Sequence, residues 1–350
     1  MTMEIESSKV AYIWCVFSSL CYAGFAIITK LTLDRGMSRY VLVAYGHAFA
    51  TLTTAILALF FDRSIKECRL TLPVSRNIVF LGILGALLRT LFYGGIECTS
   101  STFAAAMTNL TPSITFLLAI FCRMEKLVIK KHSSQAKIAG TLVSFGGATI
   151  MTLYKGITLL SWHNQNTNQA HYSKSKVFSL DQGWIMGSLM LLIHCLSSAA
   201  FYILQAKTIE QYPAPIVLTS LSSLVGTVIS TIATLILEHN KASVWRLYWN
   251  ITLLAPLFSG IVIFGIVVYI QMLAIREKGP VFVTAFSPLA TIMVAIMGLL
   301  ILGEPLHLGS VVGAMLIIVG LYAILWGKEH ENEKDATILD NSIHQIKLEK

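Results

Sequence analysis

Apolar residues in this chain gather in long runs separated by short polar connections. A run of about 20 apolar residues is long enough to cross a bilayer as an α-helix. The sequence holds ten such runs, and the pattern therefore predicts an all-α membrane protein with ten transmembrane helices. The expected helices are 11–30, 41–61, 78–97, 102–122, 136–154, 183–205, 214–237, 252–274, 281–301 and 309–326.

The composition excludes a soluble domain. Of the 350 residues, 55% are hydrophobic and 13% are charged, with a mean hydropathy of +0.71, which is more apolar than soluble chains. The first apolar run already spans a bilayer and lacks a small-residue cleavage site, so we expect an uncleaved anchor. The six cysteines form no CxxC pair in a loop. We therefore expect no disulfide, no metal site and no cofactor.

Two stretches half a chain apart share one polar pattern. Residues 108–115 read Thr-x-x-Thr-Pro-x-x-Thr, and residues 284–291 read Thr-x-x-Ser-Pro-x-x-Thr. A proline inside an apolar run removes a backbone donor and bends its helix, and hydroxyls three or four residues apart line one helix face. One interpretation is that these hydroxyls satisfy the carbonyls freed by proline. The other is a duplicated, pore-lining pair of helices.

Further matches between the two halves favour duplication. Glycines seven residues apart occur at Gly140 and Gly147 and again at Gly313 and Gly320, a spacing that lets another helix approach closely. Because each half holds five spans, the second copy enters the membrane from the opposite side, which predicts two inverted five-helix repeats. The expected segments are a terminus at 1–10, repeats at 11–154 and 183–327, a polar loop at 155–182 and a charged tail at 328–350.

Lysine and arginine divide unevenly between the two sets of connections. The set that includes both termini, with Lys137 at the start of the fifth run, holds 17 of the 26, and the opposite set holds 8. Cytosolic loops carry an excess of basic residues. The charge of +8 therefore indicates orientation, with both termini in the cytosol, and gives no sign of a nucleic-acid partner.

Arg89 is the basic residue that lies near the middle of a span. A central arginine costs about 2.5–3.5 kcal/mol on insertion scales, so it needs a reason. In the structural interpretation it pairs with Glu97 through water, or with backbone carbonyls, and locks helices together. In the functional interpretation it faces a cavity and binds the carboxylate of a solute, because its guanidinium matches that group.

Other polar residues inside the spans are further cavity candidates. His194, Ser198, Phe201 and Gln205 share one face of the sixth span, where lining a cavity competes with helix–helix hydrogen bonding. The weaker candidates, each of which fits packing better than ligand contact, are Tyr22, Asn109, Tyr202, Tyr269 and Gln271. The complete set of candidates is Arg89, Tyr93, Thr108, Asn109, Thr111, Pro112, His194, Ser198, Gln205, Gln271, Thr284, Ser287 and Pro288.

Several motifs together resemble the plant nodulin-like EamA family of the drug/metabolite transporter superfamily, over about residues 10–328. They are TSSTFA (99–104), NLTP (109–112), AKIAGT (136–141), REKGPVFV (276–283), FSPL (286–289) and LGE (302–304). The family includes bidirectional amino-acid exporters and a vacuolar auxin carrier. The resemblance implies a ten-helix transporter of small organic solutes. His47 and Arg89 depart from the family pattern, which leaves the solute open.

The expected function is transport by alternating access, with amino acids or related carboxylates as solutes. The middle of each span lacks Asp and Glu, so a facilitator or exporter is favoured over a proton-coupled pump. An enzyme is not expected, because no catalytic constellation is present. Alternatives are an auxin or other secondary-metabolite carrier, and a non-transporting scaffold or receptor. The plasma membrane is favoured over the vacuolar and endoplasmic reticulum membranes.

The orientation can be tested by protease protection. A tag fused after residue 350 should survive external protease in sealed, right-side-out plasma-membrane vesicles and be cut once detergent opens them, because the basic loops hold both termini in the cytosol. Cleavage of the tag in intact vesicles contradicts the predicted orientation.

Overall fold

The computed structural model describes residues 2–61, 70–99, 101–124, 131–153, 158–160, 182–239, 245–246, 251–297, 300–301, 306–309, 311–327 and 330. The predicted tail at 328–350, apart from His330, and most of the predicted loop at 155–182 lie outside this part of the chain. So do Glu125 and Glu304, which follow the fourth and ninth spans.

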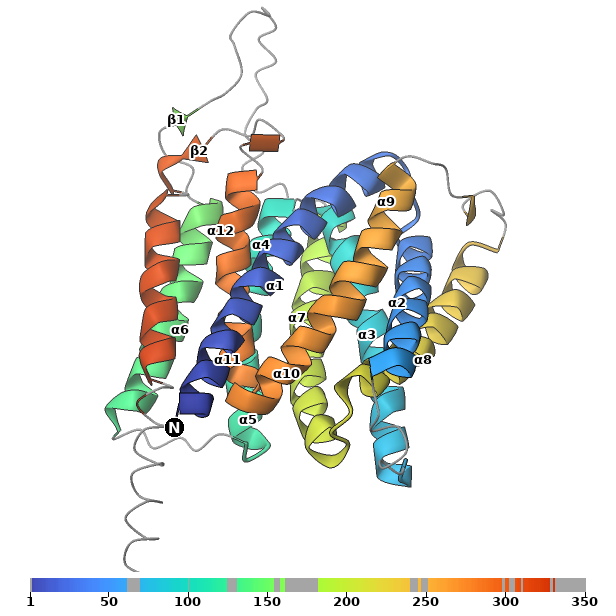
Figure 1. Ribbon diagram of the computed structural model, residues 1–350. Helices are drawn as coiled ribbons and strands as arrows, with labels where there is room; N and C mark the ends of the chain where they lie inside the picture. The colour runs from blue at the N-terminus through green and yellow to red at the C-terminus, as the bar shows by residue number, and fades with distance from the viewer. Residues whose placement is uncertain are drawn as a thin grey trace, which may run out of the picture.

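The described chain is a bundle of helices that run between the same two ends (Figure 1). The first half consists of α1 (Thr2–Asp34), α2 (Arg39–Phe61), α3 (Leu72–Cys98), α4 (Ser101–Thr108), α5 (Thr111–Phe121) and α6 (His132–Leu153). The second half consists of α7 (Gln182–Gln211), α8 (Pro215–Leu237), α9 (Ile251–Leu257), the π-helix η3 (Phe258–Val267), α10 (Val268–Lys278), α11 (Pro280–Ala285) and α12 (Ser287–Met297), followed by the helix Val311–Gly327.

The fold is helical and suited to a membrane, as predicted. Seven described helices are long and apolar enough to span a bilayer, and two shorter apolar helices accompany them, Thr111–Phe121 and Val311–Gly327. The number of ten crossings stays a prediction. The predicted all-α class needs one small addition, because two short strands, β1 (Thr158–Leu160) and β2 (Leu306–His307), pair antiparallel at one end of the bundle.

Both proline-containing stretches interrupt a helix at matching places. The span expected at 102–122 is divided into α4 and α5, with Pro112 in the first turn of α5. The span expected at 281–301 contains α11 and α12, which are separated at Phe286. Since proline cannot donate a backbone hydrogen bond, each helix is interrupted close to the residue where its ladder loses a bond.

The two halves pack as an inverted pair. In Figure 1, α1 rises from the end that holds the N-terminus and α7 descends towards it. The contacts repeat accordingly: α3 lies along α7 as α1 lies along η3 and α10, α5 contacts α7 as α12 contacts α1, and α2 pairs with α8. The helix Val311–Gly327 ends beside the N-terminus (Figure 1), so both ends of the described bundle lie on one side.

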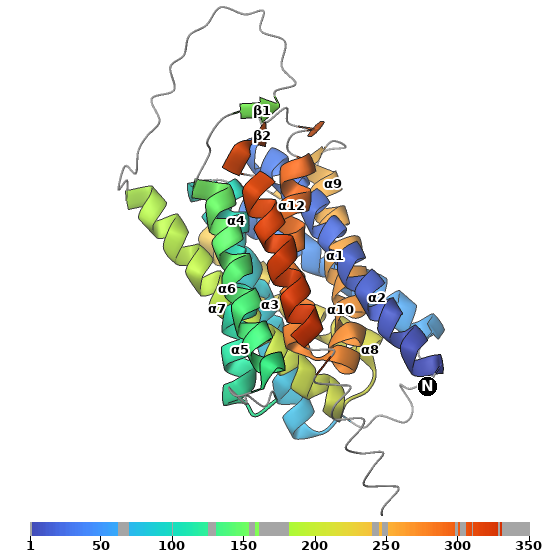
Figure 2. The same cartoon turned by 90° about the vertical axis from the view of Figure 1, so that its left-hand side faces the viewer.

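The glycine pairs found in the sequence meet each other. The helix Val311–Gly327 runs beside α6 (Figure 2). A Cβ on Gly140 would lie 2.5 Å from the Gly320 carbonyl oxygen, and a Cβ on Gly147 would lie 2.8 Å from the Gly313 carbonyl oxygen. Such distances leave no room for a methyl group. The four glycines therefore let these two helices touch along their backbones.

The glycine contact predicts a position-specific loss of stability. Replacing Gly147 by alanine should lower the free energy of unfolding by about 1–3 kcal/mol, because the new methyl group overpacks the helix pair. Gly146→Ala is the matched control, since nothing lies within 4 Å of a Cβ at Gly146. Thermal unfolding of the purified protein measures both. Equal midpoints for the two variants would show that close approach at Gly147 is not required.

Candidate functional site

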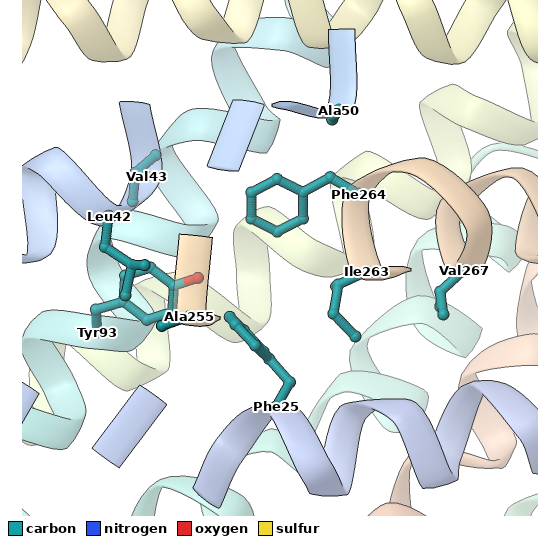
Figure 3. Packing of buried hydrophobic residues seen from close by; sticks show 9 residues of the cluster. All are labelled: Phe25, Leu42, Val43, Ala50, Tyr93, Ala255, Ile263, Phe264 and Val267. Atoms are coloured by element: carbon teal, nitrogen blue, oxygen red, sulfur yellow. The ribbon is translucent and has the colours of Figure 1, made fainter. Parts of the chain in front are cut away.

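Arg89 lies within α3 with its guanidinium held by two neighbours. Its Nη1 donates to the Gly85 carbonyl oxygen at 2.9 Å. Its Cζ lies 3.5 Å from the centre of the Phe264 ring, a cation–π contact. Phe264 belongs to η3 and to a buried apolar cluster with Phe25, and its ring stands among α2, α3 and η3 in Figure 3.

Arg89 is not neutralised by a carboxylate in the described part of the chain. Glu97, its expected partner, pairs instead with Arg39, with Nη1 and Oε2 2.6 Å apart. The backbone contact with Gly85 agrees with the other half of the structural interpretation. Arg89 is half-buried, and its guanidinium hydrogen-bonds within the described chain to Gly85, which leaves further N–H donors for another partner.

The polar side chains of Tyr22 and Gln271 join the two repeats beside the apolar cluster that contains Phe264. The Tyr22 hydroxyl of α1 donates to Gln271 Oε1 of α10 at 3.3 Å. Tyr22 also packs against the buried cluster that contains Tyr93 and Phe264, and the Phe264 ring lies against the Arg89 guanidinium. The centre of the bundle thus combines one cation with neutral polar groups from both repeats.

On the face of α7 that carries His194 and Gln205, the first residue makes hydrogen bonds and the second makes none within the described chain. His194 Nδ1 lies 2.7 Å from the Leu88 carbonyl oxygen, which can only accept, so Nδ1 donates. Its Nε2 lies 3.5 Å from the Ser198 hydroxyl. His194 therefore joins α7 to α3, in agreement with the helix–helix interpretation. Gln205 is 1% exposed, and its amide has no hydrogen-bond partner among the described residues.

The hydroxyls of the two interrupted helices serve mainly their own backbones. Thr108 donates to the Ala104 carbonyl oxygen at 2.9 Å, and Thr284 donates to that of Pro280 at 3.1 Å. This arrangement agrees with the simpler interpretation, in which the hydroxyls satisfy nearby carbonyls. Of the other cavity candidates on these helices, Thr111, Pro112 and Pro288 are buried, and Ser287 is half-buried.

Asn109 connects the two interrupted helices. It is 2% exposed, and its Nδ2 donates to the Ala105 carbonyl oxygen at 3.1 Å. Its Oδ1 accepts a hydrogen bond from the Thr291 hydroxyl of α12 at 3.3 Å. The first break is therefore tied to the helix that follows the second break, which couples the two repeats.

His47 and Phe264 complete the surroundings of Arg89. The two rings lie 4.9 Å apart. A Cβ on Gly226 would lie 2.7 Å from the His47 ring, so the ring fits against α8 because this residue has no side chain. Sequence reasoning singled out His47 and missed Phe264, because one aromatic residue inside an apolar run carries no signal of its own.

Comparison with known proteins agrees with this architecture. The model of the EamA-like transporter family matches residues 9–153 and 185–326, one match for each half of the bundle. A solved structure titled "Crystal structure of protein" superposes with a TM-score of 0.67, covering 93% of this chain and 99% of the other at 14% identity. At that identity the likeness concerns the fold alone.

Plant proteins are similar over nearly the whole length. WAT1-related protein At5g07050 of Arabidopsis thaliana is 43% identical over 336 residues, which cover 94% of this chain and 83% of the relative. WAT1-related protein At4g08290 of the same plant is 40% identical over 343 residues, covering 96% and 88%. With a family match in both halves and relatives at this identity, the chain belongs to the EamA-like transporter family.

Proposed function

We propose that this protein carries small organic solutes that bear a carboxylate, such as amino acids and related acids, across a membrane by alternating access. The observation behind the proposal is Arg89, a partly exposed cation inside the bundle that no carboxylate in the described chain neutralises. Ionisable residues within a membrane face the bundle interior or a water-filled cavity and mark solute pathways.

The contacts of Arg89 suit carboxylate binding. Guanidinium presents five N–H donors in a planar fork that can bind both carboxylate oxygens at once. One donor is used by Gly85, and Phe264 supports one face. The remaining donors can meet a solute, while the hydroxyl of Tyr22 and the amide of Gln271 offer neutral partners for its other polar groups.

The inverted packing of the two halves supports alternating access. Transporters built from inverted repeats bind solute near the midplane and rock one repeat against the other. Here Arg89 comes from the first half and Phe264 from the second, so the site is completed only where the halves meet. The spans lack a central Asp or Glu, which favours a bidirectional facilitator or exporter driven by the solute gradient.

Two alternatives follow from the family and from the fold. A carrier of auxin or another secondary metabolite would use the same fold, and a competition screen separates it: one labelled amino acid in proteoliposomes is challenged with amino acids, auxin and organic acids. A non-transporting scaffold or receptor would show no uptake at all. The plasma membrane remains the proposed location, with vacuolar and endoplasmic reticulum membranes as alternatives.

The proposal predicts a graded effect of substitutions at Arg89. Arg89→Gln should weaken uptake of a carboxylate solute by well over tenfold, because losing a desolvated charge contact costs about 2–5 kcal/mol and 1.4 kcal/mol is tenfold in affinity. Arg89→Lys keeps the charge but loses the fork, so its uptake should fall between those of wild type and the Arg89→Gln variant. Uptake into proteoliposomes, over a range of solute concentrations, measures both.

Protein level at the membrane separates binding from stability. If Arg89 binds solute, the Arg89→Gln variant should reach the membrane at a normal level. Arg76→Gln is a matched control, since Arg76 stands near the start of α3, and it should leave uptake unchanged. An Arg89→Gln variant that transports carboxylates normally would refute the proposal, and one that fails to accumulate would assign Arg89 a structural role.

A further inference from the structure

Charged side chains gather at the end of the bundle where α2 begins. Arg39 Nη1 and Glu97 Oε2 lie 2.6 Å apart, and the two side chains are 20% and 34% exposed. Next to Arg39, the Ser38 hydroxyl donates to Glu238 Oε1 at 2.8 Å. The start of α2 is thereby tied to the end of α3, in the same repeat, and to the end of α8, in the other repeat.

The position of Arg39 is built by its neighbours. Its Nη2 donates to the Tyr40 hydroxyl oxygen at 3.0 Å, and its Cζ lies 4.9 Å from the centre of the Tyr40 ring. A Cβ on Gly94 would lie 2.9 Å from Arg39 Nη1. Gly94 thus opens a place against α3 in which the guanidinium reaches Glu97, one turn further along.

Each of these charges opposes the dipole of its own helix. Arg39 is the first residue of α2, Glu97 lies in the last turn of α3, and Glu238 is the C-cap of α8. A cation at a helix N-terminus and an anion at a C-terminus are both unfavourable. Local helix stability therefore does not explain these residues, whereas their contacts with one another do.

The opposite end of the same helices is held differently. Val74 near the start of α3 packs with Ala214 and Leu218 near the start of α8 and with Met272 of α10 in one apolar cluster. The stabilisation from apolar contacts decreases in proportion to the apolar area that becomes exposed to water. An ion pair depends on geometry and is replaced by hydration once its partners separate. The two ends thus differ in the contacts that must break.

We propose that the Arg39–Glu97 ion pair and the Ser38–Glu238 hydrogen bond form a latch that closes this end of the solute pathway. Opening moves the end of α8 away from the start of α2 and releases Glu238, while water replaces the Arg39–Glu97 contact. The latch rests on the alternating-access carrier proposed above. In this role the four residues set the balance between the open and closed states of the carrier, and none of them contacts the solute.

Labelling of Cys21 tests the latch. Cys21 is half-buried and packs against the buried cluster that contains Phe264, the ring in contact with Arg89. The other five cysteines are replaced by serine, and a membrane-impermeant maleimide is added to sealed vesicles of both orientations. Arg39→Gln and Glu97→Gln should each increase labelling about fivefold from the side where α2 begins, as expected for losing roughly 1 kcal/mol of closing free energy. Labelling from the other side should not rise.

Three further variants make the test decisive. The exchange Arg39→Glu with Glu97→Arg should restore labelling towards wild type, and Ser38→Ala should raise it less than either Gln substitution. Arg35→Gln, which removes an exposed charge from the connection between α1 and α2, is the matched control and should change nothing. Wild-type labelling in both Gln variants would overturn the latch, as would an exchange variant that labels as fast as they do.

The labelling assay uses no solute, so it separates failure of the latch from failure of the proposed function. If the latch is absent, Cys21 labelling stays constant while wild-type uptake persists. If the carrier proposal is wrong, wild-type protein shows no uptake of any solute in the screen. A Gln variant that unfolds without recovery in the exchange variant also counts against the latch, because it assigns the pair a structural role.

Discussion

Satisfaction of polar groups in the absence of water is the constraint on which this structure depends. In the hydrocarbon layer each backbone N–H and C=O must find a partner within the protein. Long helices provide those partners, and the two proline breaks remove some of them. At the first break Asn109 binds the carbonyl oxygen of Ala105, and at the second the Ser19 hydroxyl of α1 lies 3.3 Å from the carbonyl oxygen of Phe286. Polar side chains at the breaks therefore repair the backbone and join neighbouring helices at the same time.

The bundle combines fixed and changeable contacts. The glycine-lined contact between α6 and the helix Val311–Gly327 brings backbones together, and such packing has one good arrangement. Near Arg89, contacts between the halves run through a cation–π pair and neutral hydrogen bonds. In the carrier proposed above, these are the contacts that a bound solute replaces. The outer helix pair thus suits a rigid frame, and the centre suits a site that changes partners.

The centre of the bundle and the end where α2 begins differ in how their charges are compensated. At the centre one guanidinium has no carboxylate partner in the described chain, so an anionic group gains from entering. At the end where α2 begins, Arg39 and Glu97 compensate each other. Because Glu97 is used there, it cannot neutralise Arg89 in this structure. The same pairing therefore leaves the centre cationic and ties the end of α3 to α2.

The sequence by itself determined the helical spans, the positions of both breaks and the glycines that meet between α6 and Val311–Gly327. These features depend on local periodicity, on the missing proline donor and on residue size, all of which can be read along one segment. Only the tertiary structure decided that Phe264 supports Arg89 and that Glu97 belongs to Arg39. It also decided that His194 joins two helices. Those partners lie on different helices, and which side chains meet depends on the rotation and depth of each helix in the bundle, which no single segment encodes.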